Sequence, residues 1–586
     1  MPSIRRSDLL LVGAAAVLSL APLACRRGAV TGSGPKGRPS TATHPVRGGT
    51  LRFATFTDVR SLDPAVAFDT ESLPWLNLMF AGLVDYDEKG NVVPDLAERW
   101  EALEDGKAYR FFLRRGLTFH DGTPLEAADI KRSIERALAP TTPNPVLSFF
   151  DPLEGATEFH AKKADEVRGV VVESPHVIVL RLVKPDATFL AVLALPTLRP
   201  VCKSGGRTYD DQFQRAACGA GPFKLGEWAP GRAMKVRRFD GWYEPGKPWL
   251  DAVECTLDVS RLTQRMMIER GEIEGIFNEF ERPGAIHFRT HPEWSKTFFE
   301  APSPDVYGEF MNVQMAPFDD VRVRRAVSYA VDRPNLARYY DGWTKPQNHV
   351  IPVGVPGHDP SFAHGQRYDL AEARRLMAAA GYPYDPKTGK GGYPQTITYW
   401  AGEGETAVRS ASLLQYDLAQ IGMRIELKVT SSAQFFAVVG RPNEARMGYG
   451  GWLMDFADPS DFFEPTFSAA GIADEESQNW ARYTSPTLEA LLSRAHGEPD
   501  TKKRLAMYQE ADRLVCDDAP WAFAYSSMRI ELTQPWLRGY KPHPIWNRAF
   551  RNAWIDPVSR AEGHAGLVGH RVGQGGLGSL LWRLGP

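Results

Sequence analysis

A chain of 586 residues is long enough for about three to five domains or two large lobes, which excludes a peptide and a domain with one small core. Lys and Arg number 69 and Asp and Glu 71, so the formal charge is −2 and gives no general attraction to nucleic acid or anionic lipid. With 43% apolar and 24% charged residues and a mean hydropathy of −0.32, the composition excludes a multi-span membrane protein. We therefore expect a largely globular protein that does not bind nucleic acid.

The N-terminus has the pattern of an export signal. Paired arginines precede an apolar run from Leu9 to Leu23, about 15 residues, which is shorter than the stretch that spans a bilayer as a mature helix. Cys25 follows Ala24 where a bacterial lipoprotein is cut and lipidated, although Pro22 stands where Leu or Val is usual. We predict a signal peptide with a lipobox over residues 1–25, lipidation of Cys25, and a location in the periplasm or on the surface of the cell envelope. The arginine pair leaves both the general secretory and the twin-arginine routes open.

Two segments have little to bury. Residues 26–47 are rich in Gly, Pro, Ser and Thr, which predicts a flexible tether between a lipid site and a folded domain. Residues 557–586 are rich in Gly, and for them we predict a disordered tail.

Five cysteines are too few for a disulfide scaffold in a chain of this size. Cys202 and Cys218 lie in one loop-rich stretch and could close a short loop in an oxidising compartment, or both could stay unpaired. Cys255 in a strand pattern and Cys516 in a helical one are expected to be buried. No CxxC or HExxH motif is present, so we expect neither a metal nor a cofactor.

From Gly48 onward, strand and helix patterns alternate. Helical spacing of apolar residues predicts a helix capped by Thr123, with Pro124 in its first turn. Further patterns predict helices over residues 321–331, 369–380 and 406–421, and strands over residues 48–55, 109–113 and 423–429. This alternation is typical of an α/β architecture.

Four distinctive stretches follow one another along the chain. They are LAERWEALEDGKAYRFFLRRGLTFHDGTPLEAADIKRSIERAL (residues 96–138), GAGPFKLGEW (219–228), FMNVQMAPFDDVRVRRAVSYAVDR (310–333) and GGWLMDFADPSDFF (450–463). Through them the chain, over about residues 48–556, resembles the extracytoplasmic solute-binding proteins of peptide and nickel ABC importers, the dipeptide- and oligopeptide-binding family. The resemblance implies an α/β, two-lobed periplasmic-binding-protein fold of the class II type, with an inserted subdomain and two crossover segments that join the lobes.

The family's organisation also implies domain boundaries. We expect the first lobe to consist of three parts, residues 48–90, 213–308 and 525–556. Residues 91–212 should form the inserted subdomain, and residues 309–524 should form the second lobe.

The resemblance points to ligand-binding residues. A free peptide carries an ammonium and a carboxylate group, and burial of either group requires a charged or hydrogen-bonding partner. Asp455 matches the family position whose carboxylate binds the peptide amine, but with Asp458 and Asp461 close by it could instead cap a turn. Arg409, near the start of a predicted helix, matches an approximate arginine position of dipeptide-binding relatives, and a solvated surface arginine is the alternative. Trp452 would stack on the ligand or support the Asp455 loop.

The resemblance implies a monomeric substrate-binding component of an ABC importer, without enzyme activity. Such a protein captures a short peptide by hinge closure and delivers it to a permease in the inner membrane. Within this class the solute could instead be a nickel chelate, a sugar or an opine. Two other classes stay open: a secreted hydrolase that uses Asp455 and Asp458, and a structural envelope lipoprotein without a transport partner. The sequence has no GxSxG or P-loop motif, which disfavours common hydrolases and nucleotide-binding proteins.

Overall fold

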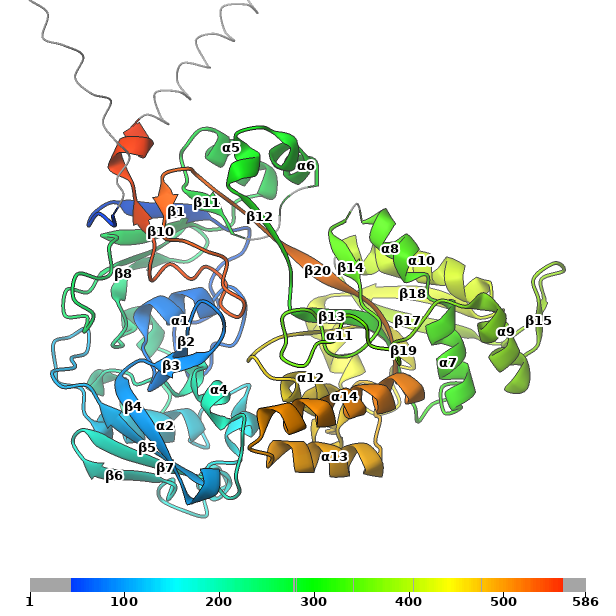
Figure 1. Ribbon diagram of the computed structural model, residues 1–586, viewed down its shortest axis with the longest axis horizontal. Coiled ribbons are helices and arrows are strands. Elements are labelled where there is room, and N and C mark those ends of the chain that lie inside the picture. The colour runs from blue at the N-terminus through cyan, green and yellow to red at the C-terminus, as the bar shows by residue number, and fades with distance from the viewer. Residues whose placement is uncertain are drawn as a thin grey trace, which may run out of the picture. The chain divides into compact units, whose positions relative to one another are not determined.

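The computed structural model describes residues 44–561, except residues 278, 279, 281, 341, 404 and 476 (Figure 1). The predicted signal peptide with Cys25, residues 26–43 of the tether, and residues 562–586 of the tail lie outside the described residues. The last part of the tether, residues 44–47, contains no helix or strand. Among the helices of the described range, none combines the length and apolar character that a bilayer crossing requires.

Within the described residues, twelve strands form one large sheet, in the order β18-β17-β19-β13-β20-β11-β1-β10-β9-β8, with β12 and β14 paired to β20. The strands are β1 (Thr50–Ala54), β8 (Phe223–Ala229), β9 (Ala233–Arg238), β10 (Ala252–Thr256), β11 (Gly275–Ile276), β12 (Phe298–Pro302), β13 (Asp305–Met311), β14 (Thr344–Pro346), β17 (Thr396–Gly402), β18 (Arg424–Thr430), β19 (Met447–Leu453) and β20 (Trp521–Thr533). We call β1, β8–β12 the first half-sheet and β13, β14, β17–β19 the second half-sheet.

Strand β20 joins the two half-sheets (Figure 1). Its residues 521–527 pair with β13 and β14, and its residues 528–533 pair with β12 and β11. The chain passes between the half-sheets a second time where β12 leads into β13. These two passages agree with the expected pair of crossover segments. The boundaries that we placed at residues 308 and 524 fall inside β13 and β20, whose backbone ladders continue through both positions.

A smaller antiparallel sheet, β4-β5-β7-β6, lies within the segment predicted as the inserted subdomain. Together with the helices that follow its strands we call it the insert; its elements are β4 (Ala97–Leu103), β5 (Ala108–Leu113), α2 (Ala127–Leu138), α3 (Ala156–His160), β6 (Val170–Ser174), β7 (Val177–Arg181) and α4 (Phe189–Leu193). Its core includes Phe111, Ile130, Ile134 and Leu180, each buried from water. The same cluster also contains residues outside the insert, such as Trp242 and Phe456, so burial of apolar surface holds the insert against the rest of the chain. Short two-stranded sheets complete the strands: β2 (Val84–Tyr86) with β3 (Val92–Pro94), β15 (Tyr384–Asp385) with β16 (Lys390–Gly391), and β21 (Leu537–Arg538) with β22 (Trp554–Ile555).

Most predicted helices are confirmed. The remaining α-helices of the described residues are α1 (Leu73–Met79), α5 (Arg261–Glu269), α6 (Arg282–Thr290), α7 (Val321–Ala330), α8 (Arg333–Tyr339), α9 (Leu370–Ala379), α10 (Glu405–Ala419), α11 (Ser432–Val439), α12 (Ser460–Phe467), α13 (Pro486–His496) and α14 (Thr501–Asp518). Asp369 caps α9 by accepting a hydrogen bond from the Glu372 backbone N–H at 3.0 Å.

The helix start predicted at Thr123 is wrong by one turn. Thr123 instead donates its backbone N–H to Asp121, at 2.9 Å, inside a tight turn. Helix α2 begins at Ala127, where Glu126 is the N-cap and forms a reciprocal capping box with Asp129. Both Thr123 and Glu126 are residues that could cap a helix. Thr123 takes part in the turn, and Glu126 caps the helix.

The second half-sheet is covered on both faces. One apolar cluster lies between this sheet and α7, α9 and α10, and it contains Tyr399, Met447 and Leu414. A second cluster on the opposite face contains Phe310 and Phe463 and includes residues of α11–α14. The edge at which the parallel strands of this half-sheet end therefore lies between two helical layers, α7, α9 and α10 on one face and α11–α14 on the other.

The predicted disordered tail is corrected at its start. Residues 557–561 are helical, because Asp556 caps them through its carboxylate, which accepts hydrogen bonds from the Val558 and Ser559 backbone N–H groups at 3.0 and 3.3 Å. Arg560 in this turn pairs with the buried Glu274 at 3.1 Å.

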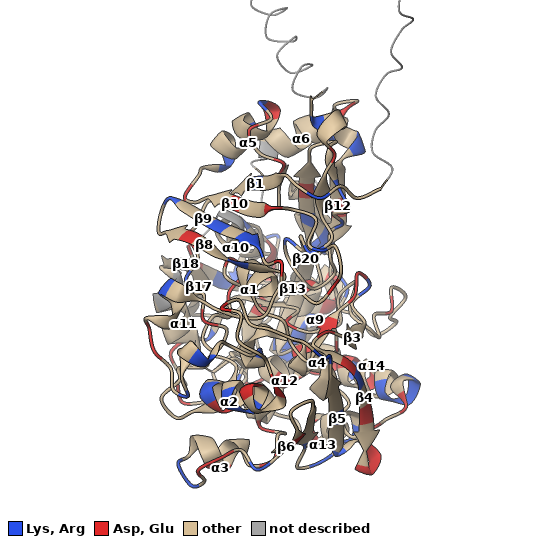
Figure 2. Cartoon of the chain, turned by 90° about the vertical axis from the view of Figure 1, so that its left-hand side faces the viewer, with Lys and Arg blue, Asp and Glu red and all other residues tan. Residues whose placement is uncertain are grey.

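Charged side chains of both signs are interspersed over the elements (Figure 2). Several ion pairs, such as that between Arg47 and Asp240, are exposed, and such pairs contribute little to stability. One that differs joins α2 of the insert to the loop after β1: Arg136 Nη1 donates to Asp63 Oδ1 at 2.9 Å, and both side chains are almost fully buried.

We predict that Arg136→Met lowers the free energy of unfolding by about 3–5 kcal/mol, because it leaves the Asp63 carboxylate buried without its partner. Urea unfolding monitored by circular dichroism measures this loss. The matched control is Arg168→Met, which removes the exposed pair with Glu154 and should change stability by less than about 1 kcal/mol. Equal losses in the two variants would contradict the prediction.

Candidate functional site

The loop that follows β19 is organised by one carboxylate. Asp461, in the first turn of α12, accepts a hydrogen bond from the Asp455 backbone N–H at 2.7 Å. The same side chain accepts a longer hydrogen bond from the indole N–H of Trp452 at 3.4 Å. Asp461 is almost fully buried. It therefore ties the end of β19 and the segment 454–457, which we call the Asp455 loop, to α12.

The other side of the Asp455 loop packs against the insert and the N-terminal part of the chain. Phe456 is buried in the apolar cluster of the insert, with its ring 5.7 Å from that of Phe149 in an edge-to-face arrangement. Tyr86 on β2 donates its hydroxyl to the Ala191 carbonyl at 2.7 Å and also lies beside the backbone of Ala457. The Asp455 loop is thus enclosed between α12 on one side and residues of β2 and the insert on the other.

This enclosure changes the acidity of the two carboxyl groups. Burial raises the pKa of Asp455 to about 7, although its contact with Asp461 opposes that rise. Burial and the neighbouring charge of Asp455 together raise the pKa of Asp461 well above its ordinary value. Two carboxyl groups in contact within a poorly hydrated site favour sharing a proton, and a cation placed between them would favour full ionisation.

Asp458 has a different role from its neighbours. Its carboxylate forms a two-pronged ion pair with Arg504 of α14, with Nη1 and Oδ1 3.0 Å apart, and it also accepts the Ser460 backbone N–H at 3.0 Å. Both partners are nearly buried. The hydrolase alternative used Asp455 with Asp458, but the structure pairs Asp455 with Asp461 and engages Asp458 in an ion pair.

The topology of the second half-sheet relates Arg409 to the Asp455 loop. Strands β17 and β19 are parallel, and Tyr399 lies opposite Met447. The carboxyl ends of parallel strands meet at one edge of a sheet, where ligands of α/β proteins commonly bind. Helix α10, which carries Arg409, follows β17 at this edge, and the Asp455 loop follows β19 there.

The structure does not bring all three predicted ligand-binding residues together. Trp452 and Asp455 share Asp461, whereas Arg409 lies on α10, over the opposite face of the same half-sheet. Arg409 is half-buried and lies near Tyr340, whose hydroxyl is 2.9 Å from that of Ser410. Helix α10 begins at Glu405, so Arg409 is its fifth residue, near the start of the helix as expected.

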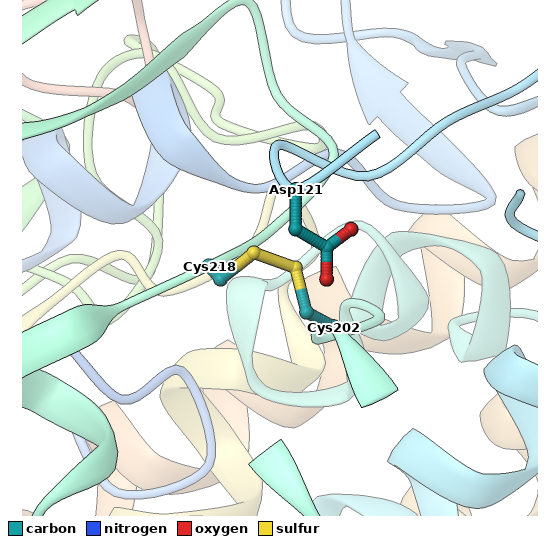
Figure 3. A group of neighbouring side chains, drawn as sticks. All are labelled: Asp121, Cys202 and Cys218. Carbon is teal, nitrogen blue, oxygen red and sulfur yellow. A yellow bond between two sulfur atoms is a disulfide. The ribbon is translucent and has the colours of Figure 1, made fainter. Parts of the chain in front are cut away.

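One group of potential metal ligands occurs among the described residues, and it does not form a metal site. Figure 3 shows Asp121 beside Cys202 and Cys218, with ligand atoms within 4.8 Å of one another. A disulfide joins the two cysteines, whose Cα atoms are 5.4 Å apart, so their sulfur atoms are not thiolates. The other two cysteines of the described chain, Cys255 and Cys516, are buried.

Sequence reasoning identified Asp455 but treated Asp461 only as a competing neighbour. The acidic residue in the first turn of a helix was the available signal, since such residues accept backbone N–H groups. Tyr86, Phe149 and Phe456 left no local signal, because their contacts join segments far apart in the chain.

The architecture and the placement of this edge define a class: a two-lobed α/β fold of the periplasmic binding proteins. The model of the bacterial extracellular solute-binding proteins, family 5 (middle region), matches residues 91–474, about two-thirds of the chain. The chain belongs to this family of solute-binding proteins.

Known relatives and structures agree with this assignment. The chain is 26% identical over 491 residues to the glutathione-binding protein GsiB of Escherichia coli K12, which covers 80% of this chain and 87% of that protein. The structure of the clavulanic acid biosynthesis oligopeptide binding protein 2 superposes with a TM-score of 0.78 at 22% identity and covers 87% of this chain and 96% of that one. DppA from Helicobacter pylori in complex with the peptide STSA gives a TM-score of 0.73 at 22% identity, with 87% and 99% covered.

The raised pKa of Asp455 predicts a pH-dependent stability. The folded protein keeps a proton on Asp455 up to about pH 7, whereas an unfolded chain releases it near pH 4. The folded state therefore binds more protons in this window, and its stability falls as pH rises from about 4 to 7. Asp455→Asn removes this penalty, so its free energy of unfolding relative to wild type should increase by about 1–3 kcal/mol between pH 5 and pH 8.

Urea unfolding at pH 5, 6, 7 and 8 checks this expectation. Asp385→Asn, in the exposed β15–β16 hairpin, is the control and should show no such increase. A difference between Asp455→Asn and wild type that stays constant with pH would contradict the assignment.

Proposed function

We propose that this protein is the solute-binding component of an ABC importer and that it captures short peptides with a free amino terminus. The observation that carries the proposal is the contact between two carboxyl groups, half-buried Asp455 and buried Asp461, on a loop that packs against both α12 and the insert. The glutathione-binding name of the relative GsiB and the peptide in the DppA structure support the choice of solute.

The amino terminus of a peptide is the cation that suits this pair. An ammonium group presents three N–H donors, and two adjacent carboxylates can accept them while they offset the cost of removing the charge from water. Trp452, which is half-buried beside the same carboxylate, offers an indole face against which the first residue of a peptide could stack.

The carboxyl terminus of the peptide requires a positive partner at the same edge of the sheet. Arg409 on α10 meets this requirement, because a guanidinium can donate two parallel hydrogen bonds to a carboxylate. A peptide that reaches from the Asp455 loop to α10 crosses the carboxyl ends of β17 and β19. The amino end of such a peptide would then lie at one face of the second half-sheet and its carboxyl end at the other face.

Capture requires the distance between two halves of the molecule to change. One half is the first half-sheet with the insert, and the other is the second half-sheet with its helices. A solute that contacts both halves stabilises only the closed arrangement, so its binding energy drives closure without covalent chemistry. The two passages of the chain between half-sheets, in β20 and between β12 and β13, are the positions where the backbone can bend. The closed protein would then dock on a permease in the inner membrane as a monomer.

Export and anchoring complete the proposal. The apolar N-terminal run and Cys25 support secretion followed by lipidation, and residues 26–47 would separate the lipid from the folded domain. An oxidising compartment is consistent with the disulfide between Cys202 and Cys218. The proposed location is the periplasmic side of the membrane.

The decisive experiment is calorimetry of the mature protein with glutathione, di-, tri- and tetrapeptides, combined with mass spectrometry of any solute that co-purifies. Recovery of an intact bound peptide supports the proposal. Cleavage of the peptides would support a hydrolase instead, and the absence of any retained solute or heat of binding would argue against solute capture.

We predict that Asp455→Ala weakens the binding of a free-amine peptide by about 2–5 kcal/mol, because a buried ammonium loses its partner. The same peptide with an acetylated amino terminus should bind weakly to both proteins. Isothermal calorimetry with trialanine and N-acetyl-trialanine makes the comparison. Asp385→Ala is the matched control and should bind as wild type does; an unchanged affinity in Asp455→Ala would remove the assignment.

For the other end of the peptide, we predict that Arg409→Ala weakens trialanine more than trialanine amide, by at least tenfold in the ratio of dissociation constants. The physical reason is that only the free carboxylate can use the charge-assisted bonds of the guanidinium. Equal losses for both peptides would show that Arg409 does not bind the carboxylate.

A further inference from the structure

His496, the last residue of α13, bridges two carboxylates from different parts of the chain. Its Nε2 lies 3.0 Å from Asp186 Oδ2, and its Nδ1 lies 2.7 Å from Glu464 Oε1. The side chain of His496 is only 15% exposed. A cation at the C-terminal end of a helix is also favoured by the helix dipole.

Asp186 belongs to the insert, in the segment between β7 and α4, whereas His496 and Glu464 belong to helices packed on the second half-sheet. Asp186 is held in position by Thr188, whose backbone N–H and hydroxyl both donate to its Oδ1, at 2.8 and 2.7 Å. A backbone hydrogen bond from the Ala187 N–H to the His496 carbonyl, 3.1 Å long, runs beside the ion pair. The contact therefore joins the insert to the second half of the molecule through both side chains and backbone.

The charge state of His496 suits this bridge. Burial by itself lowers the pKa of the imidazole, but the hydrogen bonds and charges of Asp186 and Glu464 outweigh it and raise the pKa to about 10. The same contact lowers the pKa of Asp186 despite its burial. Arg504, which is paired with Asp458, also interacts electrostatically with Asp186.

Helix α12 connects the bridge to the solute site. Glu464, which accepts from His496, stands three residues after Asp461, which holds the Asp455 loop. Residues three apart lie on neighbouring positions of one helix face. The bridge and the proposed ammonium site thus share one short helix.

We propose that His496 is a positioning residue for solute binding: by clamping Asp186 of the insert to α12, it increases the fraction of molecules in which the two halves are closed around the site. This gives the insert a role in capture. The inference rests on the proposed function, since it concerns the affinity of the same site. The apparent dissociation constant equals the intrinsic one divided by the closed fraction, so loss of the clamp weakens every solute without removing a contact to it.

The test uses Asp186→Asn and His496→Gln, which preserve side-chain size but remove one charge each. Each variant should bind trialanine and glutathione about tenfold more weakly, with most of the change in the dissociation rate. The double variant should lose little more than either single variant, because both remove the same interaction. Small-angle scattering of each empty variant should show a larger radius of gyration than wild type, and saturating solute should restore the wild-type profile.

The matched control is His349→Gln. His349 forms a buried pair with Asp512, with Nδ1 and Oδ2 2.7 Å apart, but both residues lie within the second half of the molecule. This variant should melt at a lower temperature and still bind solute with wild-type affinity and scatter as wild type does. That pattern separates a loss of stability from a loss of closure.

Scattering of the empty Asp186→Asn and His496→Gln variants that superimposes on wild type, with dissociation constants within twofold, would overturn the clamp. If wild-type protein binds none of the peptides, the proposed function fails instead. In that case the scattering of the empty variants still decides whether His496 holds the halves together.

Discussion

The arrangement of this protein depends on the cost of burying negative charge. Asp455 and Asp461 meet on a loop that packs against α12 on one side and the insert on the other, and among the residues that the structure describes neither carboxylate forms an ion pair with a cationic side chain. Backbone and indole N–H groups satisfy Asp461, and shared protonation reduces the remaining penalty. Asp458, only three residues from each, is instead neutralised by Arg504. Under the proposed function, the ammonium group of a solute would supply the positive charge beside Asp455 and Asp461.

Helix α12 connects the features that surround this site. Its first turn carries Asp461, the residues before it form the Asp455 loop, and Glu464 one turn later receives His496. Phe456 fills an apolar cluster of the insert on the other side. A displacement of the insert would disturb the apolar contact and the ion bridge together, because both act on the same short stretch of chain. Such shared elements are how a remote contact influences a binding site.

The relatives place these observations in a family whose members bind different solutes. GsiB is named for glutathione, and the DppA structure holds the peptide STSA. A fold joined by only two passages of chain accommodates both open and closed arrangements, since few backbone angles need to change.

The sequence by itself determined the family, the α/β character and the position of most helices, because these depend on local periodicity and on collinear motifs. It also singled out Asp455 as a candidate ligand-binding residue and left the Cys202–Cys218 pair open. Only the tertiary structure showed that Asp461 is the acid in contact with Asp455 and that Arg409 lies over the opposite face of the second half-sheet. It also showed that Asp186 contacts His496, more than 300 residues away in the sequence. Contacts of this kind depend on how distant segments pack, and neither residue of such a pair carries a local pattern that reveals its partner.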